Sequence, residues 1–149
     1  MKRMNFIYKT SFIASLLFLF ATSTHADYKG SIVVSKDVNI EKLSKSEIER
    51  IFLGKTTILE DGTRIQVVLS TSDSDVTDNF LKDFTGKSQR RFKKYWLKLV
   101  FAGYGIAPKF FKSDEKAKSY IQKQDGVIAF ISDNDLKDTK NLKKVLVSN

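Results

Sequence analysis

Three hydroxyl side chains follow closely after an apolar run of the sequence, those of Ser72, Ser74 and Thr77. The run, residues 65–70, is typical of a buried strand, and the hydroxyls lie where a helix begins. Open α/β sheets bind ligands at the carboxyl ends of their strands, and free amides at the start of a helix favour anions. The three residues are therefore candidate ligands for a small anion. The alternative, which is the commoner case, is that one hydroxyl only caps the helix.

A second candidate surface is the segment KSQRRFKKYW, residues 87–96, which contains five basic and three aromatic residues. This composition is also found where proteins bind nucleic acid. At 100° per residue, however, the aromatic positions fall on one face of a helix and the basic ones on the opposite face. Base stacking needs exposed rings beside the charges, so we expect an amphipathic helix and no nucleic-acid partner. Its solvated face is a candidate surface for a partner or an anion and consists of Arg90, Arg91, Lys94 and Lys98.

The same helix continues beyond Trp96 with more apolar residues. Leu97 and Phe101 point toward the basic side of the helix. We therefore expect other parts of the chain to cover the C-terminal half of this helix all round.

The residues that the chain lacks exclude several kinds of chemistry. There is no cysteine, and the only histidine is His25. Beyond residue 26, the chain therefore has no Ser-His-Asp or Cys-His pair, no disulfide and no zinc site of the usual ligands. No compact carboxylate cluster takes their place. We expect a protein that is not an enzyme and that holds neither metal nor cofactor.

The first 26 residues have the pattern of a secretory signal peptide. Lys2, Arg3 and Lys9 precede an apolar core at about residues 12–21, which is shorter than the roughly 20 residues of a membrane span. Thr24 and Ala26 fit a signal peptidase, which predicts cleavage after Ala26 and export to the periplasm. The alternative is an uncleaved N-terminal anchor. Three of the 26 basic residues and none of the 17 acidic ones precede residue 27, so the exported part has 23 against 17 and a net charge of +6.

Strand and helix signals alternate along residues 27–149, which we expect to form one domain. Ser44 and Glu47 form an S-x-x-E capping box, and Asp61-Gly62 marks a turn. The expected strands are residues 31–35, 65–70, 127–131 and 144–147. The expected helices are residues 44–54, 72–86, 88–103 and 113–124. This order predicts an α/β domain with a mostly parallel sheet, and its first strand, helix and strand predict a right-handed βαβ unit.

Several motifs together resemble a known family. The segment LSKSEIERIFLGK, residues 43–55, is similar to a helix of phosphate-specific binding proteins of ABC transporters. The order IFLGK, DGTRIQVV, FTGKS, YW, FAGYGIAPK and DGVIAFI resembles small, single-domain secreted proteins known as phosphate ABC transporter substrate-binding-like. The resemblance covers nearly all of residues 32–147. It implies a single lobe of the type II periplasmic-binding-protein fold, a three-layer sandwich of a sheet between helices.

The turn that would hold phosphate departs from the family pattern. Full-size phosphate binders have R-S-D-G-S-G-T here, and the corresponding residues begin with Ser70, so that only Ser74 matches. Asp73 and Asp75 replace the glycines, and two carboxylates repel a nearby anion. The chain is also too short for the two lobes of a roughly 300-residue binder. These departures argue against high-affinity phosphate capture and leave weaker binding open.

Two functions compete on these grounds. The first is a periplasmic solute-binding-like protein that binds phosphate or another small anion without catalysis and could serve an ABC permease. The alternative is a module that has lost its ligand and docks on an envelope protein complex or sensor through the basic helix face. Attachment to a membrane surface through the same face is possible but less favoured.

Overall fold

The structure is a computed structural model and describes residues 29–132 and 141–148, so the predicted signal peptide and its cleavage site lie outside the described residues. Its elements are β1 (Ser31–Ser35), β2 (Lys42–Ser44), α1 (Lys45–Phe52), β3 (Gln66–Ser70), α2 (Ser74–Thr85), α3 (Gln89–Phe101), β4 (Lys109–Phe111), α4 (Asp114–Lys123), β5 (Val127–Ile131), β6 (Leu142–Lys144) and β7 (Leu146–Ser148). Five strands form a sheet in the order β4-β3-β5-β1-β6, and β2 pairs with β7 in a small second sheet.

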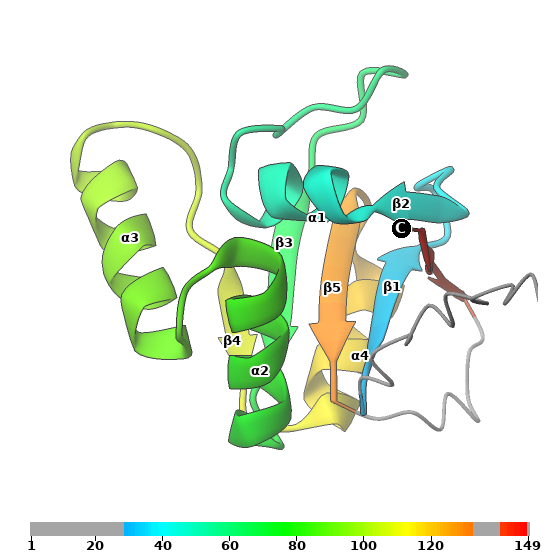
Figure 1. Cartoon of the computed structure of the whole chain (residues 1–149). Coiled ribbons are helices and arrows are strands. Elements are labelled where there is room, and N and C mark those ends of the chain that lie inside the picture. The colour runs from blue at the N-terminus through cyan, green and yellow to red at the C-terminus, as the bar shows by residue number, and fades with distance from the viewer. Residues whose placement is uncertain (1–28, 133–140, 149) are drawn as a thin grey trace, which may run out of the picture.

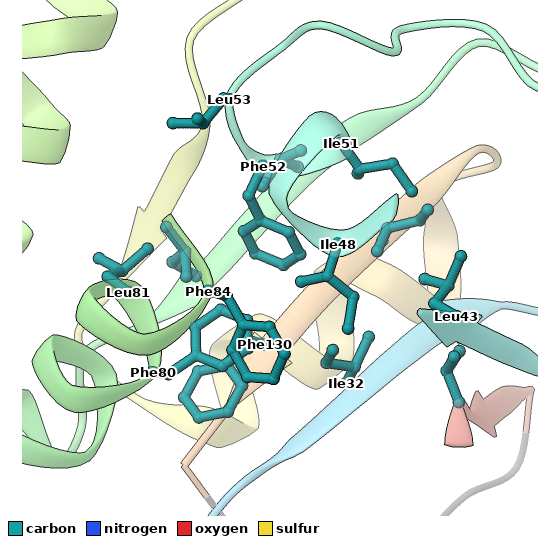
Figure 2. Close-up of a cluster of buried hydrophobic side chains, with 14 of the residues drawn as sticks. Ile32, Leu43, Ile48, Ile51, Phe52, Leu53, Phe80, Leu81, Phe84 and Phe130 are labelled. Carbon is teal, nitrogen blue, oxygen red and sulfur yellow. The ribbon is translucent and has the colours of Figure 1, made fainter. Parts of the chain in front are cut away.

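The main sheet lies between two layers of helices, as the family resemblance implies. Helices α1 and α2 cover one face and α4 covers the other, while α3 packs beside α2 toward the β4 edge (Figure 1). Side chains alternate along the strands, so that Phe130 of β5 faces α2 while its neighbour Ala129 faces α4. The larger core lies under α1 and α2, where the ring of Phe80 stacks on that of Phe130 (Figure 2).

The predicted mostly parallel sheet is confirmed, but the predicted βαβ unit is wrong. Strands β4, β3 and β5 are parallel to one another, whereas β1 is antiparallel to β5, which separates it from β3. Helix α1 has only eight residues, about 12 Å, and stays at the end of the sheet where β1 finishes (Figure 1). The chain therefore enters β3 from the same end and runs back in the opposite direction.

Two other strand predictions need correction. The strand expected at residues 144–147 is two short strands, because Val145 turns its buried side chain inward between β6 and β7 and these pair in different sheets. The sequence pattern also missed β2 and β4. Each has three residues, which is too short for an alternation of apolar and polar side chains to be recognised.

The helices begin close to the residues that the sequence predicts. Ser44 and Glu47 form the expected capping box, and Ser88 and Ser113 accept hydrogen bonds from the first turns of α3 and α4. The cap of α2 is the carboxylate of Asp73 and not one of the three candidate hydroxyls.

An aspartate of α2 also fixes the start of α3. The Asp78 carboxylate accepts hydrogen bonds from the Lys82 ammonium at 2.7 Å and from the backbone amide of Gln89 at 2.6 Å. These two donors lower the pKa of Asp78 below its ordinary value, because both stabilise the charged form. Helix α3 is therefore tied to α2 at its first residue, with its basic face turned outward.

The aromatic stripe of α3 is confirmed as the core-facing side. Phe92 and Trp96 are buried, and the indole N–H of Trp96 donates to the Phe52 carbonyl oxygen at 3.0 Å. The expectation that the C-terminal half of α3 is covered all round is wrong, because Leu97 is 56% and Phe101 83% exposed. No helix in the described ranges is long and apolar enough to cross a membrane.

Candidate functional site

The three predicted hydroxyl residues have different surroundings. Thr77 is fully buried, and its hydroxyl is within hydrogen-bond distance of the Ser70 carbonyl oxygen at 2.6 Å and the Asp73 carbonyl oxygen at 3.1 Å. Thr77 therefore stabilises the turn between β3 and α2 from its buried side. Ser72 and Ser74 are exposed on the solvent side of that turn. They are the two hydroxyls of the predicted set that solvent and a solute can reach.

Ser72 takes part in a hydroxyl cluster, which we define as Ser70, Ser72 and Ser132. The Ser70 hydroxyl donates to Ser72 Oγ at 3.2 Å, and Ser72 Oγ lies 2.5 Å from Ser132 Oγ. The Ser132 hydroxyl in turn donates to the carboxylate of Asp114 at 3.1 Å. A chain of hydrogen bonds thus joins the ends of β3 and β5 to the first residue of α4.

The fold brings this cluster together because β3, β4 and β5 are parallel, so that their carboxyl ends meet at one edge of the sheet. Thr71 completes the edge, since its amide donates to the Phe111 carbonyl oxygen at the end of β4 at 2.7 Å. Helices α2 and α4 both begin at this edge. It is the place where open α/β sheets bind their ligands.

The electrostatics of the cluster limit the anions that it can hold. The Asp73 carboxylate accepts hydrogen bonds from the amides of Asp75 and Val76 at 3.1 Å each, so these two N-terminal donors of α2 are already occupied. Asp114 adds a second carboxylate, and its acceptor role orients the hydroxyl of Ser132 away from a ligand. A doubly charged anion without a proton meets repulsion here, whereas an oxyanion with a hydroxyl group can donate to a carboxylate.

Sequence reasoning missed Ser132 and Asp114, although it predicted the elements that end and begin beside them. Both lie more than 35 residues from Ser72 along the chain, and only the order of the strands places them next to it. For Ser132 the usable signal was the polar residue that directly follows a predicted strand, whereas Asp114 comes after β4, which the sequence pattern missed.

The basic face is exposed, as predicted. Its residues, Arg90, Arg91, Lys94 and Lys98, form no ion pair with any other described residue. Lys93 lies outside this face, with its ammonium 4.6 Å from the centre of the Phe110 ring. The four charges are therefore available to a partner.

A hollow of about 570 Å³ lies away from both candidate surfaces, between α1 and the residues that lead to β2 and β3. Its charged lining residues are Lys42, Arg50, Glu41, Glu47, Glu60 and Asp61. With more acidic than basic groups and an open form, it lacks the features of an anion site. In residues 29–132 and 141–148, no group of three or more histidine, cysteine or carboxylate side chains is arranged to hold a metal ion.

The sequence matches no family model. It is likewise without a match among curated proteins.

Solved structures with a similar fold exist. A protein described as a possible phosphate-binding protein, from Planctomyces limnophilus, is 12% identical over 80% of this chain and 41% of its own, with a TM-score of 0.59. A protein described as a phosphate ABC transporter substrate-binding protein, from Clostridium perfringens and solved with bound phosphate, is 18% identical over 79% of this chain and 44% of its own, with a TM-score of 0.57. An ABC-type phosphate transport receptor from Vibrio cholerae is 16% identical over 79% and 45%, with a TM-score of 0.56.

The matched part of this chain thus spans less than half the length of each of these structures. The structural likeness covers about four fifths of this chain. At these identities the likeness concerns the fold alone. This chain therefore has the α/β fold of a single periplasmic-binding-protein lobe, and its resemblance to phosphate ABC transporter substrate-binding proteins is confirmed at the level of the fold.

Proposed function

We propose that this protein is an exported, non-catalytic, solute-binding-like protein whose hydroxyl cluster binds a small oxyanion that carries a proton, with phosphate as the first candidate. The observation that supports it most directly is the meeting of Ser72, Ser132 and Asp114 at the carboxyl edge of three parallel strands. Hydroxyls can donate to phosphate oxygens, and a carboxylate can accept the phosphate proton. Export to the periplasm and delivery to an ABC permease are part of the same proposal.

The expected affinity is low. The amides of Asp75 and Val76 that would face an anion are bound to Asp73, and a ligand must compete with the hydrogen bonds inside the cluster. We expect a dissociation constant on the order of 1 mM for phosphate and weaker binding of sulfate, which has no proton to donate at neutral pH. Calorimetric titration of the exported protein with both anions measures this. The proposal would be contradicted if millimolar phosphate produced no heat of binding and no thermal shift.

Replacing Ser132 by alanine is expected to weaken phosphate binding roughly 5- to 10-fold, because Ser72 loses the hydrogen bond that positions its hydroxyl beside Asp114. The matched control is Ser119→Ala on the exposed side of α4, which should leave binding unchanged. The same calorimetric titration compares the two variants. Equal affinities for both would place the phosphate elsewhere.

A second function, docking on an envelope component through the basic face, is supported by the four basic side chains without ion-pair partners among the described residues. Under this proposal, chemical cross-linking joins the wild-type protein to an envelope component. The double variant Arg91→Glu/Lys94→Glu should lose this cross-linked product. Lys116→Glu with Lys123→Glu, on the other face of the sheet, makes the same change of charge and should leave it in place. An unchanged set of cross-linked components in the first variant argues against this function.

A further inference from the structure

Apolar side chains are exposed at the end of α3 and in the loop that follows it. This apolar tip consists of Leu97, Val100, Phe101, Tyr104 and Ile106. Phe101 is 83% and Ile106 78% exposed, and Tyr104 is 69% exposed. Five large apolar side chains within ten residues form an unusually apolar surface for a small protein, and such surfaces mark sites of association.

Positive charge is concentrated around the same tip. The stretch of residues 84–113 contains eight basic residues and no acidic one, whereas the rest of the chain after residue 26 has 15 basic and 17 acidic residues. On α3, Lys94 and Lys98 share the exposed side with Phe101, at 100° per residue. The basic face thus begins within one turn of the tip and continues along the helix behind it.

The backbone of the tip is suited to a medium of low polarity. The amide of Gly103 donates to the Val100 carbonyl oxygen at 3.0 Å, and the amide of Tyr104 to the Leu99 carbonyl oxygen at 2.8 Å. This is a Schellman motif, with Gly103 at a φ of 78° that favours glycine. It satisfies carbonyl groups at the end of α3 that would otherwise need water.

The tip is also held firmly in place. The Tyr95 hydroxyl donates to the Leu53 carbonyl oxygen at 2.8 Å, and the Trp96 indole to that of Phe52 at 3.0 Å. At the other end of the loop, the Gln66 side-chain amide donates to the Ala107 carbonyl oxygen at 3.2 Å. Both ends are anchored to the body of the domain, so the apolar side chains stay outside the core.

We propose that the apolar tip and the basic face together bind the surface of an anionic lipid bilayer. Phe101, Tyr104 and Ile106 enter the headgroup region, and the basic side chains behind them contact lipid phosphates. A second copy of this chain fits this surface poorly, because two basic faces would repel each other.

This inference rests on the proposed docking function and names lipid, rather than protein, as the partner of the basic face. It is independent of solute binding. The α3–β4 loop lies at the amino end of β4. The hydroxyl cluster lies at the carboxyl ends of the parallel strands β3 and β5, which is the opposite end of these strands (Figure 1). A bilayer at the tip therefore leaves the cluster open to solvent.

The test is co-sedimentation of the exported protein, its mature N-terminus checked by mass spectrometry, with vesicles. We expect binding to phosphatidylcholine vesicles that contain about 30% phosphatidylglycerol, none to pure phosphatidylcholine, and at least roughly tenfold weaker binding at 0.5 M than at 0.05 M salt. Phe101→Ser with Ile106→Ser, and separately Lys94→Glu with Lys98→Glu, should each lower the partition coefficient about tenfold or more.

Matched controls separate surface contact from general effects. Ile58→Ser with Leu146→Ser removes exposed apolar side chains elsewhere, and Lys116→Glu with Lys123→Glu changes the same charge on α4. Both controls should bind vesicles as the wild type does. Equal losses in controls and tip variants would overturn the proposal, as would absence of binding to anionic vesicles at low salt.

A spectroscopic variant tests insertion directly. In Phe101→Trp, emission should shift to the blue and become shielded from acrylamide when anionic vesicles are added, while Ile58→Trp should not respond. An unshifted Phe101→Trp spectrum with protein bound to the vesicles would overturn insertion of the tip. If the wild type does not bind vesicles and Arg91→Glu/Lys94→Glu loses a cross-linked envelope protein, the basic face binds a protein partner and the lipid proposal is overturned. Calorimetry with phosphate reports on the cluster separately.

Discussion

Replacing Phe80 by alanine is expected to lower the free energy of unfolding by about 3 to 5 kcal/mol. The Phe80 side chain is 1% exposed and stacks on the Phe130 ring with centroids 3.9 Å apart. Its ring centroid also lies 5.1 Å from that of Phe52, in an edge-to-face contact, and 4.8 Å from that of Phe84 (Figure 2). The substitution therefore leaves a cavity where α1, α2 and β5 meet. Urea unfolding followed by circular dichroism measures the loss.

Phe101→Ala is the matched control, because it removes the same ring from an exposed position. We expect it to change the free energy of unfolding by less than about 0.5 kcal/mol. A loss in Phe101→Ala as large as that in Phe80→Ala would mean that the tip is packed against the body of the protein. A negligible loss in Phe80→Ala would contradict the position of α2 on the sheet.

Replacing Gly54 by alanine is expected to destabilise the protein by about 2 to 4 kcal/mol. Gly54 has a φ of 68°, where a side chain is strained, and an added Cβ would lie 2.4 Å from the ring of the buried Trp96. The ring is held by its hydrogen bond to Phe52, so it cannot move aside freely. Thermal or urea unfolding of the variant tests this. The contact explains why IFLGK and YW occur together in this chain: the glycine provides the space that the tryptophan fills.

Gly62→Ala separates the two causes, since Gly62 has a φ of 88° but nothing within 4 Å of an added Cβ. We expect a loss of about 1 kcal/mol there, from backbone strain alone. Both substitutions restrict the unfolded chain equally, so the difference between them measures the contact with Trp96. If both variants lose the same amount of stability, the Trp96 ring adjusts without cost.

The parts of the fold that depend on near neighbours in sequence were predictable. The bounds of β1 and β5 and the capping box of α1 agree with the sequence expectations, and α3 and α4 begin one residue after the expected starts at Ser88 and Ser113. Caps and turns act over three or four residues, and a buried strand of five β-branched or apolar residues is recognisable by itself. Of the candidate site, the same local reasoning identified the turn after β3 and the exposed basic face.

The rest required contacts that are distant in sequence. The antiparallel direction of β1 depends on β5, which follows about 95 residues later and inserts between β1 and β3. Ser132 and Asp114 join Ser72 for the same reason. The exposure of Phe101 depends on the absence of any described element over the end of α3, which helical periodicity cannot reveal.

The sequence by itself therefore determined the helices and the strands β1, β3 and β5. It also determined the separation of aromatic and basic residues on α3 and the absence of histidine and cysteine chemistry from residues 27–149. Only the tertiary structure decided which strands are neighbours, that the hydroxyls of two strand ends meet at a carboxylate, and that an apolar tip remains uncovered. The physical reason is that local backbone preferences act within a few residues, whereas burial and strand pairing join residues that the chain separates widely.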